Sequence, residues 1–392
     1  MRYRQSLLWG FSVLLLLFVA FGSLLTLLLL PETAHADGGA PNLAYVAGGK
    51  GGVSIVDIAK QQVTGTLHVA SAPAEVQLSL DGRFLCVTQP QLGQLVVLSA
   101  KTGQTVCSVH VPGHPTLLSL DSNFNTIFVA APDSATITGV DMNTCHVKLT
   151  IQADGLVSGM AVATVSSNVS GNTGDQLWVA AKTVSIFDTL KGTKLTSIAL
   201  PDQPQYVTIP VGTTVYVTTH DGKIDAIDLS SHHVVTLLSG GTYGPMDFDE
   251  NTGEVYVPDM QHDQLVVLTP VNAGYTLPPE PNRTIHFNAE PQSVAITSDG
   301  QWGFVALNNG SVAMLDIPGR QIAKTIEVGG TPRFIITGLY PPIIGTTPQQ
   351  ASVFGTLANI GAYFFLGLVI LVPLLLLTRY SLRKRASLKK DI

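Results

Sequence analysis

The stretch Pro291–Gly329, PQSVAITSDGQWGFVALNNGSVAMLDIPGRQIAKTIEVG, predicts four short β-strands within about forty residues. The first run alternates apolar and small residues and ends at Asp299-Gly300, a pair typical of a tight turn between two strands. A second run is centred on Phe304, a third ends at Pro318-Gly319, and a fourth ends near Val328. Four strands in a unit of this length are typical of one blade of a β-propeller.

The second strand of this unit has a short signature, an aromatic or apolar residue followed by Val and a small residue, which recurs along the chain. Its copies begin 38 to 50 residues apart, close to the roughly 40–45 residues that a four-stranded blade needs. The two longest intervals contain polar insertions at 166–175 and 270–283. The copies predict seven blades, at Tyr45-Val46-Ala47, Cys86-Val87-Thr88, Phe128-Val129-Ala130, Trp178-Val179-Ala180, Tyr216-Val217-Thr218, Tyr256-Val257-Pro258 and Phe304-Val305-Ala306.

The two ends of the repeat region predict how the ring closes. The first copy, 43–69, has only three predicted strands, and the repeats end with one unpaired strand at 332–339. Adding that strand to the first copy completes a blade and covers two open sheet edges. The expected fold is therefore all-β, a seven-bladed propeller of four-stranded blades closed by a C-terminal strand, with a hydrophobic helix at each end of the chain.

Several of these motifs resemble the YVTN family of seven-bladed propellers. The resemblance rests on Tyr216-Val217-Thr218-Thr219, on the turns at Ser79–Gly82 and Ser298–Gly300, and on Val328–Pro332. It extends over about residues 43–339 and implies the propeller fold in a bacterial-type, membrane-anchored protein. It implies no activity, because one fold carries many functions.

The N-terminal 36 residues read as an export signal. Arg2 and Arg4 precede the uncharged apolar run 7–30, and Ala34-His35-Ala36 has the form of a cleavage site. The apolar run is also long enough to span a bilayer, so a retained signal anchor is the alternative. Residues 37–42 would then link this segment to the propeller.

The C-terminal segment predicts a membrane anchor. A Pro-rich linker at 340–350 leads into the uncharged apolar run 351–378, which is long enough to cross a membrane. The basic tail 379–392 follows, and basic segments stay in the cytoplasm. We therefore expect a cell-membrane protein with an extracytoplasmic propeller, anchored by the C-terminal helix and by a second helix if the N-terminal signal is retained.

Charge narrows the class of partner. The chain has 21 Lys and Arg residues, of which 13 lie between residues 37 and 350. It has 27 Asp and Glu residues, of which 25 lie in the same range, so this part has a net charge near −12. A surface of this sign repels nucleic acid, so no nucleic-acid partner is expected. It favours cations, or neutral and basic ligands.

Ligands of propellers usually meet the mouth of the central channel, which the loops before each first strand and those between second and third strands should surround. Both chain ends should leave by the opposite face, so that the mouth faces away from the membrane. No motif for a haem, quinone or other cofactor occurs in the chain, and none is expected. The residues expected at the mouth are His114, Asp202, Tyr243, Glu290 and Arg333.

A denser polar patch predicts a possible metal site on the fifth and sixth blades. Imidazole and carboxylate groups on adjacent loops could hold a divalent ion. The alternative is a solvated loop edge, because no fixed ligand spacing is present. The residues concerned are His220, Asp221, Asp259, His262 and Asp263.

The three cysteines, Cys86, Cys107 and Cys145, leave at least one thiol unpaired. Predicted strand order separates all of them, so the expectation is no disulfide, with Cys107–Cys145 the one pairing worth testing. The leading functional hypothesis is a membrane-tethered binding or scaffold module for a protein or small ligand. The alternative is a lactonase-like or metal-assisted hydrolase at the same mouth, with His114, Glu290 and Arg333 as its polar group.

Overall fold

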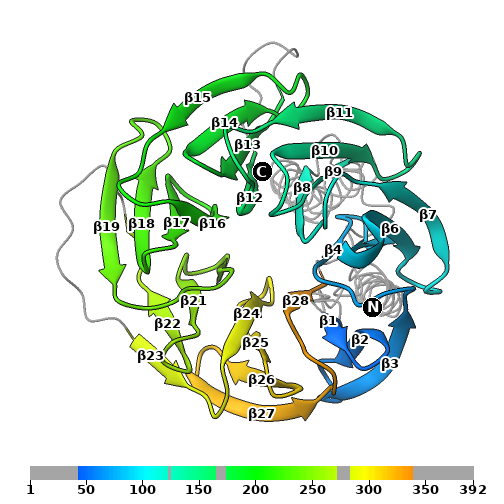
Figure 1. Cartoon of the computed structure of the whole chain (residues 1–392). Helices are drawn as coiled ribbons and strands as arrows, with labels where there is room; N and C mark the ends of the chain where they lie inside the picture. The colour runs from blue at the N-terminus through cyan, green and yellow to red at the C-terminus, as the bar shows by residue number, and fades with distance from the viewer. Residues whose placement is uncertain (1–42, 122–124, 165–173, 272–282, 339–392) are drawn as a thin grey trace, which may run out of the picture. The chain divides into compact units, whose positions relative to one another are not determined.

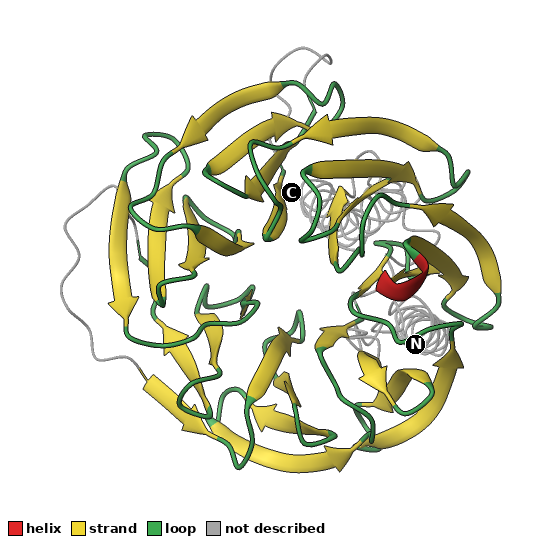
Figure 2. Cartoon of the chain, viewed as in Figure 1, coloured by secondary structure: helices red, strands yellow, loops and turns green. Residues whose placement is uncertain are grey.

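The computed structural model describes residues 43–121, 125–164, 174–271 and 283–338 as seven antiparallel sheets set in a ring around a central opening (Figure 1). Each sheet has four strands, which confirms the predicted seven-bladed propeller. Within these residues the secondary structure is strands and loops, apart from the single 3-10 turn η1 (Figure 2).

The strands follow the chain from the channel outwards in six blades, and in the remaining blade the last strand, β28, lies inside β1, β2 and β3. Their bounds are β1 Leu43–Gly49, β2 Gly52–Asp57, β3 Gln62–His68, β4 Val76–Leu78, β5 Phe84–Gln89, η1 Pro90–Leu92, β6 Gln94–Ser99, β7 Thr105–His110, β8 Leu117–Asp121, β9 Thr126–Ala130, β10 Thr136–Asp141, β11 Val147–Gln152, β12 Gly159–Ala163, β13 Gln176–Ala180, β14 Val184–Asp188, β15 Lys194–Ile198, β16 Pro204–Thr208, β17 Thr214–Thr219, β18 Lys223–Asp228, β19 Val234–Ser239, β20 Asp247–Phe248, β21 Val255–Asp259, β22 Gln264–Leu268, β23 Arg283–His286, β24 Pro291–Ile296, β25 Trp302–Leu307, β26 Ser311–Asp316, β27 Gln321–Glu327 and β28 Phe334–Thr337.

The blades are numbered here in chain order. Blade 1 has the order β28-β1-β2-β3, and the following strands fill blades 2 to 7 in groups of four. The predicted closure is therefore confirmed, with β28 as the inner strand of blade 1. Its residue Ile335 lies opposite Val46 of β1, and the Gly338 N–H donates to the Leu43 carbonyl at 3.0 Å. Both ends of the propeller thus leave at the same edge of the same blade.

The core lies between neighbouring blades, because each blade is a sheet whose two faces are covered by the next sheets in the ring. One cluster joins Phe128 of β9 to Leu177 and Val179 of β13. These side chains are completely buried, and burial of each stabilises the fold by about 1.5–3 kcal/mol. The aromatic-Val-small signature therefore marks the strand that contacts two neighbours at once.

The turns between third and fourth strands share one design. In blade 4, the Asp188 carboxylate accepts the N–H groups of Leu190 at 2.9 Å and Lys191 at 2.8 Å, and Gly192 follows with φ 68°. Blade 3 repeats this design with Asp141, but its left-handed position is Cys145, with φ 61°. Blades 1, 5 and 7 also place a residue with a Cβ at this left-handed position, namely Gln61, His232 and Arg320, with φ of 53°, 58° and 53°.

Cys145 forms a disulfide with Cys107 of β7, which joins blades 2 and 3 with a Cα–Cα distance of 6.4 Å. The expectation of no disulfide was wrong. It placed both cysteines on outer strands, which are far apart, whereas Cys145 lies in the turn before β11 and reaches the neighbouring blade. The third cysteine, Cys86 of β5, is buried and free.

The predicted segments 1–36, 37–42, 340–350, 351–378 and 379–392 lie outside the described residues. Within the described part of the chain, no helix is long and apolar enough to cross a membrane.

Candidate functional site

The inner strands of all seven blades line a central channel with a volume of about 770 Å³. Its wall is mixed, with apolar side chains such as Leu120, Val162 and Phe248 beside a few carboxyl groups. Figure 1 looks along this channel, with β4, β8, β12, β16, β24 and β28 around it.

Two carboxyl groups in the channel wall connect neighbouring inner strands. Glu75 accepts the Leu118 N–H of the next blade at 3.1 Å, and Asp247 accepts the Ile296 N–H at 2.7 Å. The inner strand is the edge of its sheet, so its outward N–H groups need partners from elsewhere. Glu75 and Asp247 therefore connect the blades at the channel wall.

Burial changes the protonation of these two groups. It raises the pKa of Glu75 well above its usual range, and raises that of Asp247 to about 7, with a smaller contribution from the negative charge of Glu250. Sequence reasoning missed both residues. The available signal was a carboxylate two positions after the proline that precedes an inner strand, in Pro73-Ala74-Glu75 and Pro245-Met246-Asp247.

This shift predicts a pH-dependent stability. The pKa of Asp247 is higher in the folded than in the unfolded chain. The contribution of this carboxyl group to the free energy of unfolding therefore falls as pH rises from about 4 to about 7. The Asp247→Asn variant keeps an acceptor for the Ile296 N–H and should gain about 1–3 kcal/mol at pH 8. Urea unfolding at pH 8 and at pH 4.5 measures this, and an equal gain at both values would contradict the assignment.

On the mouth face, polar side chains connect two parts of the same blade. One part is the loop before the inner strand, and the other is the hairpin formed by the second and third strands. In blade 3, Asp133 accepts the His114 N–H at 2.9 Å and lies 2.5 Å from its Nδ1. In blade 5, Lys223 pairs with Asp202. These contacts stabilise the loops that form the rim of the channel.

Blade 7 repeats this arrangement with Glu290, which accepts hydrogen bonds from Asn308 and Gln292, both at 3.0 Å. Tyr243 differs from the expectation, because its ring is buried in the core of blade 6 beside Tyr216. Burial and the Asp259 charge raise the pKa of Tyr243 to about 12. It is a packing residue of the rim rather than a group that faces the opening.

The predicted mouth residues are thus distributed around the rim. His114, Glu290 and Arg333 precede the inner strands of blades 3, 7 and 1, and the first two already have partners. The structure does not bring them together as one polar group. Arg333 is exposed, and no side-chain partner for its guanidinium is found among the described residues.

The five predicted metal-binding residues separate into two sets. Asp221 lies beside Asp202, and their mutual contact raises the pKa of Asp221. Asp259 lies 2.6 Å from His262 Nδ1 and also accepts from Gln264 at 3.0 Å. Across the described residues, no group of three or more His, Cys, Asp or Glu side chains is placed to hold a metal ion.

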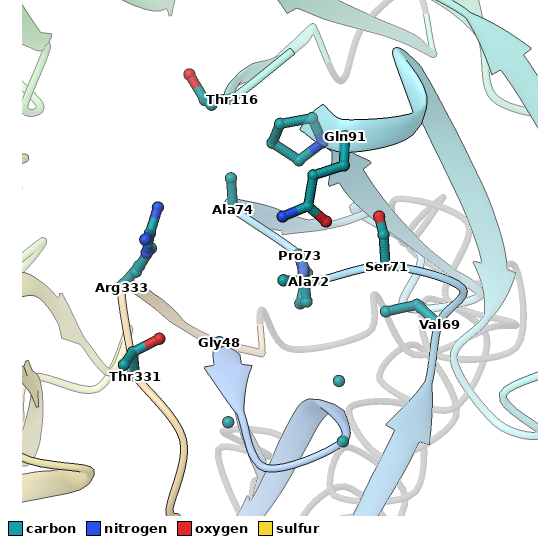
Figure 3. A pocket seen from close by; sticks show the side chains of 14 residues that line it. Gly48, Val69, Ser71, Ala72, Pro73, Ala74, Gln91, Thr116, Thr331 and Arg333 are labelled. Atoms are coloured by element: carbon teal, nitrogen blue, oxygen red, sulfur yellow. The ribbon is translucent and has the colours of Figure 1, made fainter. Parts of the chain in front are cut away.

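A second cavity of about 400 Å³ opens on the mouth face between blades 1 and 2 (Figure 3). We call it the Arg333 cavity. One wall is the glycine-rich turn between β1 and β2, another is the loop before β4, and η1 forms a third. Arg333 and Thr116 contribute to both this cavity and the central channel.

Comparison with known proteins supports the fold. No family model and no curated protein matches the chain, so the resemblance to the YVTN family stays a prediction. Among solved structures, hydrazine synthase from Kuenenia stuttgartiensis is 15% identical with a TM-score of 0.59, over 69% of this chain and 90% of that one. The Swd1 β-propeller domain from Myceliophteria thermophila is 13% identical with a TM-score of 0.58, over 70% of this chain and 91% of that one.

A third structure, the dihydro-heme d1 dehydrogenase NirN in complex with DHE, is 14% identical with a TM-score of 0.55, over 81% of this chain and 79% of that one. Identities this low show a shared propeller fold and nothing about activity.

Proposed function

We propose that this protein is a membrane-tethered, extracytoplasmic binding or scaffold module that holds a ligand or protein partner on the mouth face of its propeller. The observation that carries the proposal is the state of the mouth side chains. Those of His114, Asp202 and Glu290 are fixed in pairs within their own blades, whereas the Arg333 guanidinium has no side-chain partner within the part of the chain that the structure describes. A rim held in place by such pairs is preorganised for recognition, which lowers the cost of binding.

Two further observations support the location. The Cys107–Cys145 disulfide is typical of proteins in oxidising compartments outside the cytoplasm. Both ends of the propeller leave blade 1 together, at the end of β28 and the start of β1. Apolar segments on both sides of the propeller would then tether it from one edge and leave the mouth free.

Location is tested by labelling single engineered cysteines in intact cells. Lys182 is exposed on the mouth face, and Ser387 lies in the basic tail. We expect a membrane-impermeant maleimide to label Lys182→Cys in intact cells, and Ser387→Cys only after permeabilisation. The reverse pattern, or labelling of both without permeabilisation, would overturn the topology.

Binding is tested with a photo-cross-linking residue at the same mouth position. The matched control is Lys101, an exposed lysine in a turn on the opposite face. A discrete adduct from position 182 and none from position 101, in native membranes, is the expected result. Adducts only from 101, or from neither position, would overturn the mouth as the binding face for a protein partner.

A further inference from the structure

The Arg333 cavity is hollow because its walls lack bulky side chains. Four glycines of the β1–β2 turn and the alanines of the loop before β4 line it. At Gly48 a Cβ would lie 2.1 Å from the Thr331 carbonyl oxygen, and at Gly52 it would lie 2.3 Å from the Leu67 carbonyl oxygen. The backbone therefore requires glycine at these two positions, and the space beside them stays open.

Every polar side chain in the lining of the cavity can donate a hydrogen bond. Figure 3 shows Arg333, Gln91 and Thr116 around the same space, contributed by blades 1, 2 and 3. The Arg333 guanidinium has five N–H donors and no acceptor, and the Gln91 amide adds two more. A cavity lined in this way suits a ligand group that only accepts.

Ser71 adds an independent observation. Its Oγ atom is buried and has no hydrogen-bond partner among the described residues. Because Ser71 lines the cavity, a rotation of its side chain would offer this free hydroxyl to a ligand there. Gln89 holds the loop that carries Ser71. When the Gln89 amide is oriented with its oxygen toward this loop, the oxygen accepts the N–H groups of Ala70 at 2.9 Å and Ser71 at 3.2 Å.

The other blades show which kind of group is missing. In blade 3 a carboxylate, Asp133, contacts the imidazole of His114 at the corresponding place, and in blade 5 Asp202 pairs with Lys223. In blade 1 the corresponding turn is made of glycines with Lys50 and offers Arg333 no carboxylate. A carboxylate from a ligand would complete in blade 1 the pairing that the protein provides elsewhere.

Charge favours a single negative charge over two. A guanidinium fork matches a carboxylate with two parallel hydrogen bonds. Acidic side chains outnumber basic ones on the mouth loops, so their field opposes the entry of any anion, and it opposes a dianion about twice as strongly as a carboxylate. The cavity volume of about 400 Å³ lies in the usual range for small-ligand sites.

We propose that the Arg333 cavity binds a carboxylate group, supplied by a small organic acid or by the C-terminus of a polypeptide. This inference rests on the proposed function and names the chemistry that the mouth recognises. Arg333 holds the carboxylate, Ser71 and Gln91 donate further hydrogen bonds, and the pyrrolidine ring of Pro73 contacts the apolar part of the ligand.

The test measures calorimetric binding of four probes to the full-length protein in detergent. They are glucuronate, the peptide acetyl-Ala-Ala-Val with a free C-terminus, its amidated twin, and inorganic phosphate. We expect at least one carboxylate probe to bind. Binding of the free peptide alone identifies a polypeptide C-terminus as the source, and binding of glucuronate alone identifies a small acid. The amidated peptide should bind at least about tenfold more weakly than a carboxylate that binds.

Variants connect the result to the named side chains. Arg333→Gln should weaken carboxylate binding about tenfold or more, whereas Lys182→Gln, with the same change of charge elsewhere on the rim, should not. Ser71→Ala should weaken binding about threefold to tenfold without lowering the melting temperature, because its hydroxyl has no partner among the described residues.

Four results would overturn the inference. The first two are no carboxylate binding up to roughly 10 mM and equal binding of the acid and its amide. The other two are tighter binding of phosphate than of a carboxylate and wild-type affinity in Arg333→Gln. Cross-linking from position 182 with any of these results would leave the proposed function intact and remove only this cavity from it. Carboxylate binding without cross-linking from position 182 would support the Arg333 cavity and would remove only the protein partner from the proposed function.

Discussion

Replacing Ile335 by Asp is expected to open the propeller ring and to destabilise the protein by more than about 4–5 kcal/mol. Ile335 is only 1% exposed and packs with Val46 of blade 1 and Phe304 of blade 7. An aspartate there would bury a carboxylate in an apolar cluster. The strand that carries Ile335, β28, has only four residues and is paired with β1 at four positions. Few other contacts therefore hold the ring closed if the packing of Ile335 is lost.

The measurement is a thermal melt with size-exclusion chromatography of the full-length protein. Because Ile335→Asp is expected to aggregate, a graded series keeps the effect measurable: Ile335→Val should lose about 0.5–1.5 kcal/mol and Ile335→Ala about 2–5 kcal/mol. Ile322→Asp on β27 is the control, since Ile322 is 41% exposed, and it should change stability by no more than about 0.5 kcal/mol. Equal losses at both positions would contradict a special role for ring closure.

Much of the fold could be predicted because it rests on local patterns that repeat. The aromatic-Val-small signature and the Asp-Gly turns each depend on a local requirement, and the signature is still recognisable over seven copies when a single copy is irregular. Closure was predictable as well, since a three-stranded first copy and a single strand at 332–339 leave one consistent arrangement. Each of these features depends on residues close together in the sequence.

The candidate site was much less predictable, because it depends on which side chains meet across loops and between blades. His114 and Glu290 were correctly placed in loops before inner strands, but the sequence could not show that Asp133 and Asn308 already engage them. The predicted pairing of residues 220–221 with 259–263 assumed that adjacent loops converge. In the structure Asp221 meets Asp202 of its own blade instead.

Contacts between blades were the hardest to foresee. In the sequence, Glu75 and Asp247 are single charged residues beside apolar ones, with no partner nearby. Their hydrogen-bond partners lie 43 and 49 residues away. The Cys107–Cys145 bond was missed for a similar reason, since a turn rather than a strand places Cys145 beside the neighbouring blade. Only the three-dimensional register of one blade against the next decides such pairs.

The second large effect is expected from that disulfide. The Cys107→Ser/Cys145→Ser double variant should be less stable by about 4 kcal/mol, because opening a closed loop with a sequence separation of 38 residues restores chain entropy to the unfolded state. Urea unfolding of the double variant and of the wild type, with and without reductant, measures the loss. Reductant should bring the wild type to the stability of the double variant and leave the variant itself unchanged, because Cys86 is buried and unpaired in both.

A matched variant separates the covalent bond from the backbone that it holds. Cys145 has φ 61°, whereas blades 2 and 4 place Gly103 and Gly192 at the equivalent turn position. Cys107→Ser/Cys145→Gly should therefore recover about 1 kcal/mol relative to the double serine variant, because glycine adopts this conformation without the Cβ penalty. If the serine and glycine variants are equally stable, the turn relaxes once the bond is absent. If neither differs from the wild type, the bond does not form in the folded protein, and the support that it gives to an oxidising compartment is lost with it.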